Sequence, residues 1–549
     1  MGSLLLTTIV FPLAGAAMLT GSPARARQSA LVSTLIVLGM AGWLVFHYPA
    51  GTSDYAAVDL RWLGADSPVD IRFSIALDGL SVWLFGLTAL LSVVAVLVSW
   101  KAIDQGARSY YRLLLVLETG MLGVFSARDI ILFYIFFEFT LIPLFFLIGV
   151  WGSEERRHAA VKFFVFTMAG GVLTFLSLLA LVFWAAQYGP MTFSIPALTV
   201  RLAVAPPPLA LQTAIFVGLF AGFAIKVPLF PLHTWLPLAH VQAPTAGSVL
   251  LAGVLLKIGS YGFVRFAVPM LPDAAALLMP GLLWLSVAGI LYGAMTALAQ
   301  SDIKRLIAYS SVSHLGFCML GVFCLNRIGM QGAVLQMVNH GLSTGGLFAV
   351  VGMIYERYHT RQIRDLGGLA RRTPRLATMM LILTLSSIGL PGLNGFAGEF
   401  LILLGMFQRA WGDAPPGIAG QLRAISVLAT FGVVLGAWYM LQLIQRVFFG
   451  PLREPAAAAE HPVEDLSARE TLALAPLVVL IVWIGLWPGF FLERMAPTLD
   501  RIVLQAETGG DPFVVPPLGG KRTAAELSTT SFTMPPEGGT TNGSRSATP

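Results

Sequence analysis

Long apolar segments separated by short polar loops run through almost the whole chain. Of its 549 residues, 56% are hydrophobic and only 11% are charged, and the mean hydropathy is +0.78. A membrane-spanning helix needs about 20 mainly apolar residues, because its backbone must satisfy its own hydrogen bonds inside the lipid. These properties predict an all-α, polytopic membrane protein and exclude a soluble globular chain.

Two of the apolar segments are interrupted. The segments at 211–239 and 376–408 are longer than a plain span, and Pro228 and Pro231 break the first, while Pro391 lies among glycines in the second. Two interrupted helices in two corresponding halves are typical of transporters with internal repeats. We count fourteen candidate spans, at 3–20, 30–47, 79–100, 109–126, 129–150, 160–186, 211–239, 244–268, 276–299, 303–325, 330–355, 376–408, 423–447 and 470–492.

The basic residues of the loops predict the orientation of the chain. If the N-terminus lies outside, most Lys and Arg residues fall in loops that face inside, as the positive-inside rule requires. An even number of spans then places both termini outside. The outer loop at 48–76 is acidic and is expected to contain short strands. The chain from about Glu507 onward is rich in Gly, Pro, Ser and Thr, which predicts a disordered polar tail.

Glu138 and Lys226 are charged residues at membrane depth. A charge there costs roughly 3 kcal/mol on insertion scales, so its position calls for a functional explanation. Glu138 is central in its span, and Lys226 immediately precedes the first proline break. Opposite charges at close range stabilise each other's ionised form, so we expect the two to be partners. The alternative is a static ion pair that fixes helix packing, but buried pairs stabilise poorly compared with apolar packing.

Four more titratable residues extend this set: Lys257, His314, His340 and Glu399. Lys257 is central in GSVLLAGVLLKIGSYGFV, where it could give up its proton; the alternative is a snorkelling lysine. Glu399 follows the second break and suggests a proton-binding group or a helix N-terminal charge. His314 and His340 lie in successive spans and could relay protons, or could be hydrogen-bonded core residues.

Three residues are secondary candidates. His233 and His240 follow Lys226 at steps of seven, which would place all three on one face of an unbroken helix. The prolines put this register in doubt for Lys226. Metal binding is not expected, because helical histidine ligand pairs prefer i, i+4 spacing. Glu118 lies inside the fourth span, nearer its centre than a loop charge would be.

The sequence offers no redox or nucleotide site to accompany these groups. Cys318 and Cys324 cannot hold a four-thiolate cluster and are interpreted as small buried apolar residues. No GxGxxG follows a strand, and there is no Walker motif. Titratable groups at membrane depth therefore indicate proton or cation translocation with energy supplied from elsewhere. A scaffold that only joins neighbouring chains would leave these groups unexplained.

Several stretches resemble the antiporter-like membrane subunits of respiratory complex I, over roughly residues 75–450. They are FEFTLIPLFFLIGVWG, KFFVFTMAGG, KVPLFPLHTWLPLAHVQAPTAGSVLLAGVLLKIGSYG, DIKRLIAYSSVSHLGF and LPGLNGFAGEF. The resemblance implies fourteen core helices, two inverted five-helix repeats that each hold a broken helix, and a hydrophilic axis across the membrane arm. By motif it also implies a coupling pair, connecting groups, a central relay and a distal site. Glu138 and Lys226 would be the coupling pair, and Lys257 and His314 would be the connecting groups. His340 would be the central relay, and Glu399 the distal site.

The same resemblance implies partners and a location. Proton pumping would be coupled to NADH:quinone electron transfer elsewhere in the complex, with no cofactor on this chain and FMN, iron–sulfur clusters and quinone on partner subunits. Sister antiporter-like chains would lie on either side, in a bacterial inner membrane with both termini periplasmic. The expected parts are an N-terminal three-helix region at 1–108, repeats at 109–268 and 276–447, a C-terminal helix region at 448–494 and a polar tail at 507–549.

Two details bear on the place of this chain within the family. Sister chains mostly carry lysine at the position of Glu399, so the acid favours one type of subunit. Several relatives have an acid where this chain has Leu238, which puts a loop contact in doubt but not the role of Lys226. Two other functions stay open: a subunit of a multi-chain sodium/proton antiporter, and a membrane subunit of a hydrogenase complex.

Overall fold

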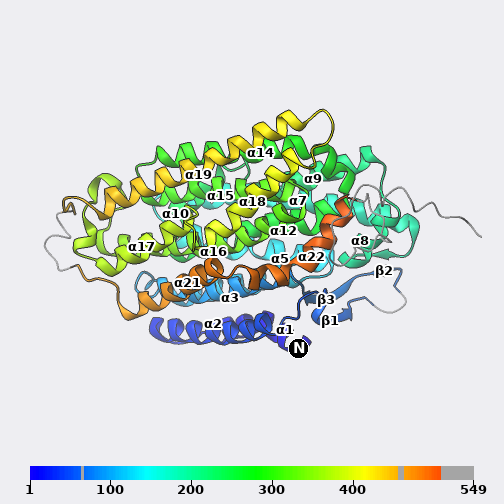
Figure 1. Cartoon of the computed structure of the whole chain (residues 1–549). Helices are drawn as coiled ribbons and strands as arrows, with labels where there is room; N and C mark the ends of the chain where they lie inside the picture. Colours follow the sequence, from blue (N-terminus) through cyan, green and yellow to red (C-terminus); the bar gives the residue numbers. More distant parts are fainter. Residues whose placement is uncertain (64–66, 456–462, 508–549) are drawn as a thin grey trace, which may run out of the picture. The chain divides into compact units, whose positions relative to one another are not determined.

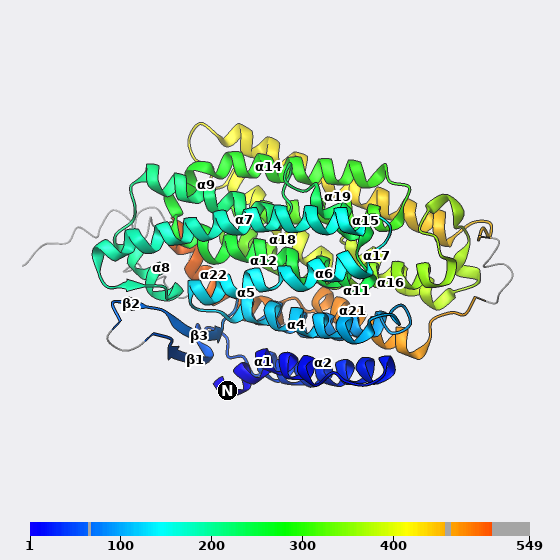
Figure 2. The same cartoon turned by 180° about the vertical axis from the view of Figure 1, so that it is seen from behind.

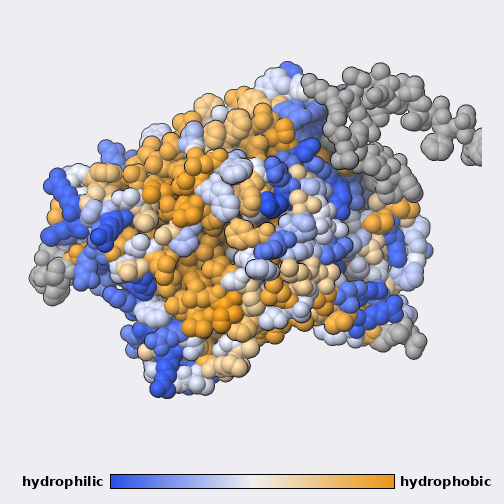
Figure 3. Space-filling view, turned by 60° about the horizontal axis from the view of Figure 1, so that its bottom comes forward, coloured by the Kyte–Doolittle hydropathy of each residue, from blue (hydrophilic) through white to orange (hydrophobic). Residues whose placement is uncertain are grey.

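Long helices lie side by side in this computed structural model, which describes residues 1–63, 67–455 and 463–507 (Figure 1). Ten of the described helices are long and apolar enough to cross a membrane. Figure 3 shows apolar side chains in a broad band across one face, with hydrophilic side chains at both ends. A band of this kind fits a lipid layer, so the multi-pass membrane fold expected from the sequence is confirmed.

The N-terminal part combines three helices with a small sheet. Strands β1 and β3 pair antiparallel, with Tyr55 opposite Leu77 and Arg61 opposite Arg72. The short strand β2 pairs separately with β4 (Met191–Thr192), which comes later in the chain. The strands expected in the 48–76 loop are therefore present. Helix α2 begins earlier than expected because Ser22 caps it and Pro23 fits its first turn. The elements are α1 (Gly2–Met18), α2 (Pro23–Phe46), β1 (Tyr55–Arg61), β2 (Val69–Asp70), β3 (Arg72–Leu77) and α3 (Val82–Val98).

The first broken helix follows in the next group of elements. Helix α9 ends at Lys226, and α10 begins only at Trp235, so the interruption expected at the prolines is confirmed. The short helix α8 was not predicted. The elements are α4 (Ala107–Ser126), α5 (Ile130–Phe139), α6 (Leu141–Trp151), α7 (Arg156–Ala185), η1 (Ala186–Tyr188), β4 (Met191–Thr192), α8 (Ile195–Val204), α9 (Leu209–Lys226) and α10 (Trp235–Gln242).

The following span, Thr245–Met270, changes its winding twice. Two stretches, η2 and η3, are π-helical and lie on either side of Lys257. In η2 the amide of Leu256 donates to the carbonyl of Leu251, five residues back, as a π-helix requires. The elements are α11 (Thr245–Leu250), η2 (Leu251–Leu255), α12 (Leu256–Gly262), η3 (Phe263–Ala267) and α13 (Val268–Met270).

The second half contains the second broken helix. Helix α17 ends at Ser387 and α18 begins at Asn394, and Gly389 and Gly392 take left-handed backbone angles in between. The polar tail expected beyond about Glu507 lies outside the described residues. The elements are α14 (Pro272–Leu298), α15 (Ile303–Phe323), α16 (Arg327–Tyr358), η4 (Ile363–Asp365), η5 (Leu369–Arg371), α17 (Pro374–Ser387), α18 (Asn394–Trp411), α19 (Ala419–Phe448), α21 (Ala468–Leu486) and α22 (Gly489–Glu507).

Two spans form the centre of the bundle, Thr245–Met270 and α16. In each of these two spans the most apolar window of 18 residues is entirely buried, whereas only 39% of the corresponding window of α2 is buried. They approach closely because both carry glycine at the crossing: a Cβ on Gly341 would lie 2.7 Å from the carbonyl oxygen of Gly253. The two central spans also carry Lys257 and His340, so these titratable residues lie in the interior.

The loops at the two ends of the bundle differ in character. One end carries β1, β2 and β3, visible in Figures 1 and 2 beside the N-terminus. At the other end, which we call the basic end, α15 and α17 begin and α16 ends. It contains the loops 299–302 and 359–373, which pair through a bridge between Asp302 and Gln362. These two ends give the reference directions for the site.

Candidate functional site

The first break places Lys226 at the end of a helix and next to an aromatic ring. Its side chain is buried, and its ammonium nitrogen lies 4.4 Å from the ring centroid of Phe137 on α5. The indole of Trp235, at the start of α10, donates a hydrogen bond of 2.9 Å to the carbonyl of Ile225. This bond ties the two halves of the broken helix together beside the lysine.

Glu138 lies on α5 at the edge of the bundle. Its side chain is only half-buried, whereas Ile135 on the same helix and Ile142 at the start of α6 are exposed. Its carboxylate packs against Gly171 of α7, and its buried Oε1 atom has no hydrogen-bond partner among the described residues. Among the same residues Glu138 and Lys226 form no ion pair within 4 Å, although each is within electrostatic range of the other. The expected pair is therefore close but not in contact.

Replacing Gly171 by alanine is expected to move the Glu138 carboxylate. A Cβ at this position would overlap with Oε1 of Glu138, so the side chain must turn away from α7. Gly149 of α6 is a matched control, because a Cβ there meets only the Cβ of Ala160 at 3.5 Å. The check is the position of the Glu138 side chain in a structure of each variant. A Glu138 side chain that stays in place in Gly171→Ala would contradict this contact between α5 and α7.

Lys257 and His340 are in direct contact at the centre of the bundle. The Lys257 side chain is fully buried, and its nitrogen lies 2.7 Å from Nδ1 of His340. The lysine also donates to the carbonyl oxygen of Ala252 in η2. A buried ammonium group needs such partners, because leaving it unpaired in apolar surroundings is very costly. The two contacts hold the group between the central spans.

His314 and Glu399 form a second cluster, joined to the first by a pair of imidazoles. The His314 and His340 ring centroids are 5.7 Å apart, and Nδ1 of His314 lies 3.2 Å from Oε1 of Glu399. Gln336 donates to the same carboxylate oxygen at 3.1 Å, and Ser387 lies 3.2 Å from Nε2 of His314. Four predicted residues, Lys257, His340, His314 and Glu399, thus follow one another through the interior.

The secondary candidates lie outside this contact series. His233 falls in the turn before α10 and packs against Tyr292 at a centroid distance of 5.0 Å. His240 lies in the last turn of α10 and stacks on Phe348 of α16. Glu118 of α4 is fully buried, and both of its carboxylate oxygens lack hydrogen-bond partners among the described residues. The common face suggested by seven-residue spacing does not form, because the turn separates Lys226 from the histidines.

Sequence reasoning missed two groups of polar residues. Gln336 precedes His340 by four residues, so a shared helix face was the available signal for its role at Glu399. Arg265 is the second case: it forms a buried ion pair of 2.7 Å with Asp78. Asp78 also accepts hydrogen bonds from the backbone amides of Leu80 and Ser81, just before α3. Its ion pairs could not be seen because the partners are distant in sequence.

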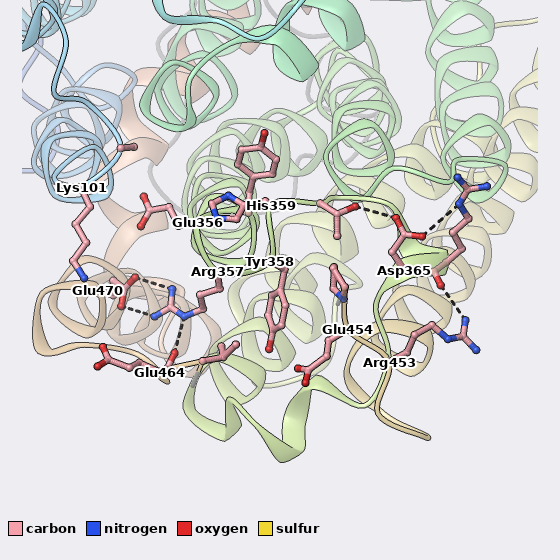
Figure 4. Close-up of a pocket in the computed structure, with 16 residues that line it drawn as sticks. Lys101, Glu356, Arg357, Tyr358, His359, Asp365, Arg453, Glu454, Glu464 and Glu470 are labelled. Carbon is pink, nitrogen blue, oxygen red and sulfur yellow. Dashed lines mark hydrogen bonds and ion pairs between the residues drawn. The ribbon is translucent and has the colours of Figure 1, made fainter. Parts of the chain in front are cut away.

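A large cavity opens at the basic end and is shown in Figure 4. It has a volume of about 1210 Å³, and none of the six principal candidate residues lines it. Arg357 reaches across one side and bonds both carboxylate oxygens of Glu470, at 2.9 and 2.8 Å. This bidentate contact joins the last turn of α16 to the first turn of α21, so the wall of the cavity is structural at this point.

The sequence of this chain is similar to the sequences of a known family of membrane proteins. Residues 127–414 match the family described as "NADH:quinone oxidoreductase/Mrp antiporter, TM". The chain is 39% identical over 518 residues to NADH-quinone oxidoreductase subunit M of Rhodobacter capsulatus, covering 91% of this chain and 96% of the relative. It is 42% identical over 452 residues to the Escherichia coli K12 protein of the same name, covering 81% and 84% of the two chains.

Solved structures give the same result for the fold. A chain of respiratory complex I from Thermus thermophilus with bound NADH superposes with a TM-score of 0.78 at 32% identity, covering 91% of this chain and 99% of that chain. A chain of the Mrp complex from Dietzia sp. gives a TM-score of 0.76, covering 91% and 52%. Its identity is 24%, so this second likeness concerns the fold alone.

Proposed function

The chain belongs to the family of antiporter-like membrane subunits represented by NADH-quinone oxidoreductase subunit M, and we propose that it carries protons along the side chains from Glu138 to Glu399. It is a membrane-arm subunit of complex I, and its relatives are subunits of an NADH-quinone oxidoreductase. The proposal concerns the path within this chain and the part that each residue plays.

The contact series from Lys257 to Glu399 is the observation that carries the proposal. A lysine, two imidazoles and a carboxylate follow one another across the interior. At one end of the series the Lys257 nitrogen lies 2.7 Å from Nδ1 of His340, and at the other Nδ1 of His314 lies 3.2 Å from Oε1 of Glu399. Each group can bind and release a proton, and a histidine can do both with its two ring nitrogens. Apolar residues would stabilise the core at least as well, so a transfer function explains their presence better than stability does.

The gap between Glu138 and Lys226 supports a gating step at the start of the path. Two unit charges 4 Å apart interact by about 4 kcal/mol at an effective dielectric constant of 20. Glu138 packs on Gly171 and makes no ion pair with the lysine among the described residues, so a movement of the carboxylate would change the distance between the two charges. Its approach would favour a proton on Lys226, and its departure would drive that proton towards Lys257.

The surroundings of the chain extend the proposal. Glu138 lies at a partly exposed face, where a neighbouring sister chain would complete its environment. FMN, iron–sulfur clusters and quinone would be held by other subunits, and electron transfer there would supply the energy. Both termini would lie on the periplasmic side of a bacterial inner membrane. The two repeats would then be 109–268 and 276–447, each with one broken helix.

The change Glu138→Gln tests this function, because it removes the charge and keeps the size of the side chain. In native membranes we expect NADH oxidation with quinone and the proton gradient to fall together, while a native gel shows an assembled complex. Glu154→Gln is the matched control, since Glu154 is exposed in a loop. A Glu138→Gln complex that oxidises NADH and forms the proton gradient at the rates of the unaltered complex would rule out the gating step.

A further inference from the structure

Three buried amide side chains connect the second break to Glu399. They are Gln336 and Asn339 of α16 and Asn394, the first residue of α18, and none is more than 3% exposed. Gln336 donates from Nε2 to Oε1 of Glu399 at 3.1 Å, and its own Oε1 accepts from Nδ2 of Asn339 at 3.2 Å. We call these three side chains the amide network. It ends on the last carboxylate of the proposed path.

Backbone groups fix which end of each asparagine amide donates. The Gly395 amide can only donate, and it bonds Oδ1 of Asn394 at 2.9 Å, as the Ser386 hydroxyl does at 2.5 Å. Nδ2 of Asn394 faces the other way and donates to the backbone carbonyl of Asn339 at 3.4 Å. Asn339 in turn donates from Nδ2 to the backbone carbonyl of Asn394 at 2.7 Å. Because a carbonyl can only accept, both asparagines are held in one orientation.

The orientation of the asparagines determines that of Gln336. Since Nδ2 of Asn339 is a donor, Gln336 must present its oxygen to Asn339 and its NH2 group to Glu399. With the amide reversed, two donors would meet at Asn339 and two acceptors at Glu399. The carboxylate therefore receives a hydrogen bond whose direction is set at the start of α18.

Close packing leaves the amide network little freedom. A Cβ on Gly398 would overlap with Oε1 of Gln336 and would lie 2.9 Å from Nδ2 of Asn339. On the other side of the carboxylate, a Cβ on Gly389 would lie 2.9 Å from Oε2 of Glu399. The Glu399 carboxylate is thus held between the amide of Gln336 and the backbone of the second break.

We propose that Gln336 is a positioning residue for proton transfer from His314 to Glu399. The two asparagines of the amide network would set its direction from the second break. This role rests on the proton-carrying function proposed above and adds the group that aligns its last step. In that step an imidazolium at His314 loses its Nδ1 proton to Oε1 of Glu399: the N–H bond breaks, the O–H bond forms, and both groups end neutral.

Alignment matters in this step because the two atoms are 3.2 Å apart. Over this distance a lone pair of Oε1 must point at the imidazole N–H for the proton to cross. A carboxylate oxygen has two such lone pairs. Gln336 occupies one of them, which keeps the carboxylate turned so that the other faces His314.

A purely structural network explains the arrangement less well. Apolar side chains would hold α16 against α18 at lower cost, because a buried polar atom without a hydrogen bond is destabilising. Oδ1 of Asn339 is such an atom, since it has no hydrogen-bond partner among the residues that the structure describes. An asparagine here is explained by what its NH2 group does, which is to bond Gln336 and the carbonyl of Asn394.

The experiment measures proton pumping and its solvent isotope effect in native membranes that contain the assembled complex. Gln336→Met keeps the length of the side chain and removes the donor, so pumping driven by NADH should fall about tenfold or more. The ratio of the rates in H₂O and D₂O should rise, because a misaligned proton transfer becomes the slow step. A loss of stability alone would lower the amount of complex on a native gel and leave this ratio unchanged.

Asn339→Leu tests the amide network itself, because Asn339 makes no hydrogen bond to Glu399 among the described residues. The change keeps the branched shape and removes the donor that directs Gln336. We expect the same rise in the isotope effect, and little further loss when it is combined with Gln336→Met, since both changes act through one contact. Losses that multiply would overturn the role of the network. If Gln336→Met does not assemble, the isotope effect of Asn339→Leu decides.

Gln212→Met is the matched control for the loss of a buried amide. Gln212 lies on α9, is 1% exposed and donates to Asp273 at 2.9 Å, outside the series from Lys257 to Glu399. Its replacement should leave the isotope effect of pumping unchanged. An equal rise in Gln212→Met and Gln336→Met would overturn the positioning role.

Glu399→Gln separates this inference from the function on which it rests. If Glu399→Gln abolishes pumping while Gln336→Met pumps at the normal rate with an unchanged isotope effect, the positioning role is wrong and the central path remains. If Glu399→Gln itself pumps normally, the proposed path fails, and the positioning role fails with it.

Discussion

Replacing Lys257 by arginine is expected to abolish proton pumping although the positive charge is kept. An arginine side chain stays protonated at any physiological pH, so it cannot pass its proton to His340. Lys257→Met should fail as well, because it removes the group that contacts the imidazole and the Ala252 carbonyl. Both variants should retain the complex on a native gel while the proton gradient and NADH oxidation with quinone are lost.

The control for this prediction is Lys162→Arg. Lys162 lies on α7 and is partly exposed, with its nitrogen 5.8 Å from the ring centroid of Phe166. A complex that carries Lys162→Arg should pump protons at the normal rate. Normal pumping by Lys257→Arg would mean that Lys257 acts as a fixed charge and not as a proton carrier. Failure of both Lys257→Arg and Lys162→Arg would point to general damage by the larger side chain.

Removing the charge of Asp78 is expected to destabilise the folded protein strongly. Asp78 is 2% exposed and pairs with Arg265 at 2.7 Å and with Arg128 at 3.3 Å. Breaking a buried pair by removing one partner costs about 3–5 kcal/mol, and here Arg265 would stay buried without a carboxylate, while Arg128 keeps its pair with Asp54 at 2.6 Å. Asp78→Asn should therefore lower the temperature at which the purified complex dissociates. A midpoint within a degree of the unaltered complex would contradict this role.

Asp59→Asn is the matched surface control. Asp59 pairs with Arg72 at 2.6 Å, but its side chain is 46% exposed, so its loss should cost at most about 1 kcal/mol.

The pH dependence of stability gives a second check on Asp78. Burial alone would raise the pKa of Asp78, but Arg265 and Arg128 hold that pKa well below its usual range. Its stabilisation is therefore full above the unfolded pKa and is lost as the pH falls towards the folded one.

Much of the fold was predictable because lipid imposes strong rules on sequence. The apolar runs predicted the helices, and Pro228 and Pro231 predicted the first break, because proline removes a backbone donor. The glycines around Pro391 did the same for the second break. Ten described helices meet the length and hydropathy required of a span, and three shorter apolar helices do not, so the number of fourteen spans stays a prediction.

The contacts at the site were beyond sequence reasoning for a geometric reason. Lys257 and His340 are 83 residues apart, and nothing in either span fixes which turn of one faces which turn of the other. Their register depends on close packing at Gly253 and Gly341, which is a property of the pair of helices. The same holds for Ser387, whose hydroxyl reaches His314 only because the break ends α17 at that level.

The π-helical turn before Lys257 has a consequence for how such a chain tolerates insertions and deletions. A π-helical turn contains one more residue than an α-helical turn, so η2 is equivalent to a one-residue insertion in a regular helix. Deleting one residue from Leu251–Leu255 would restore regular winding and leave the later side chains facing as they do now, whereas a deletion in an α-helical part of the span would rotate them by about 100°. Lys257 would then still face α16, so this segment is the part of the span in which the loss of one residue disturbs the direction of the lysine least.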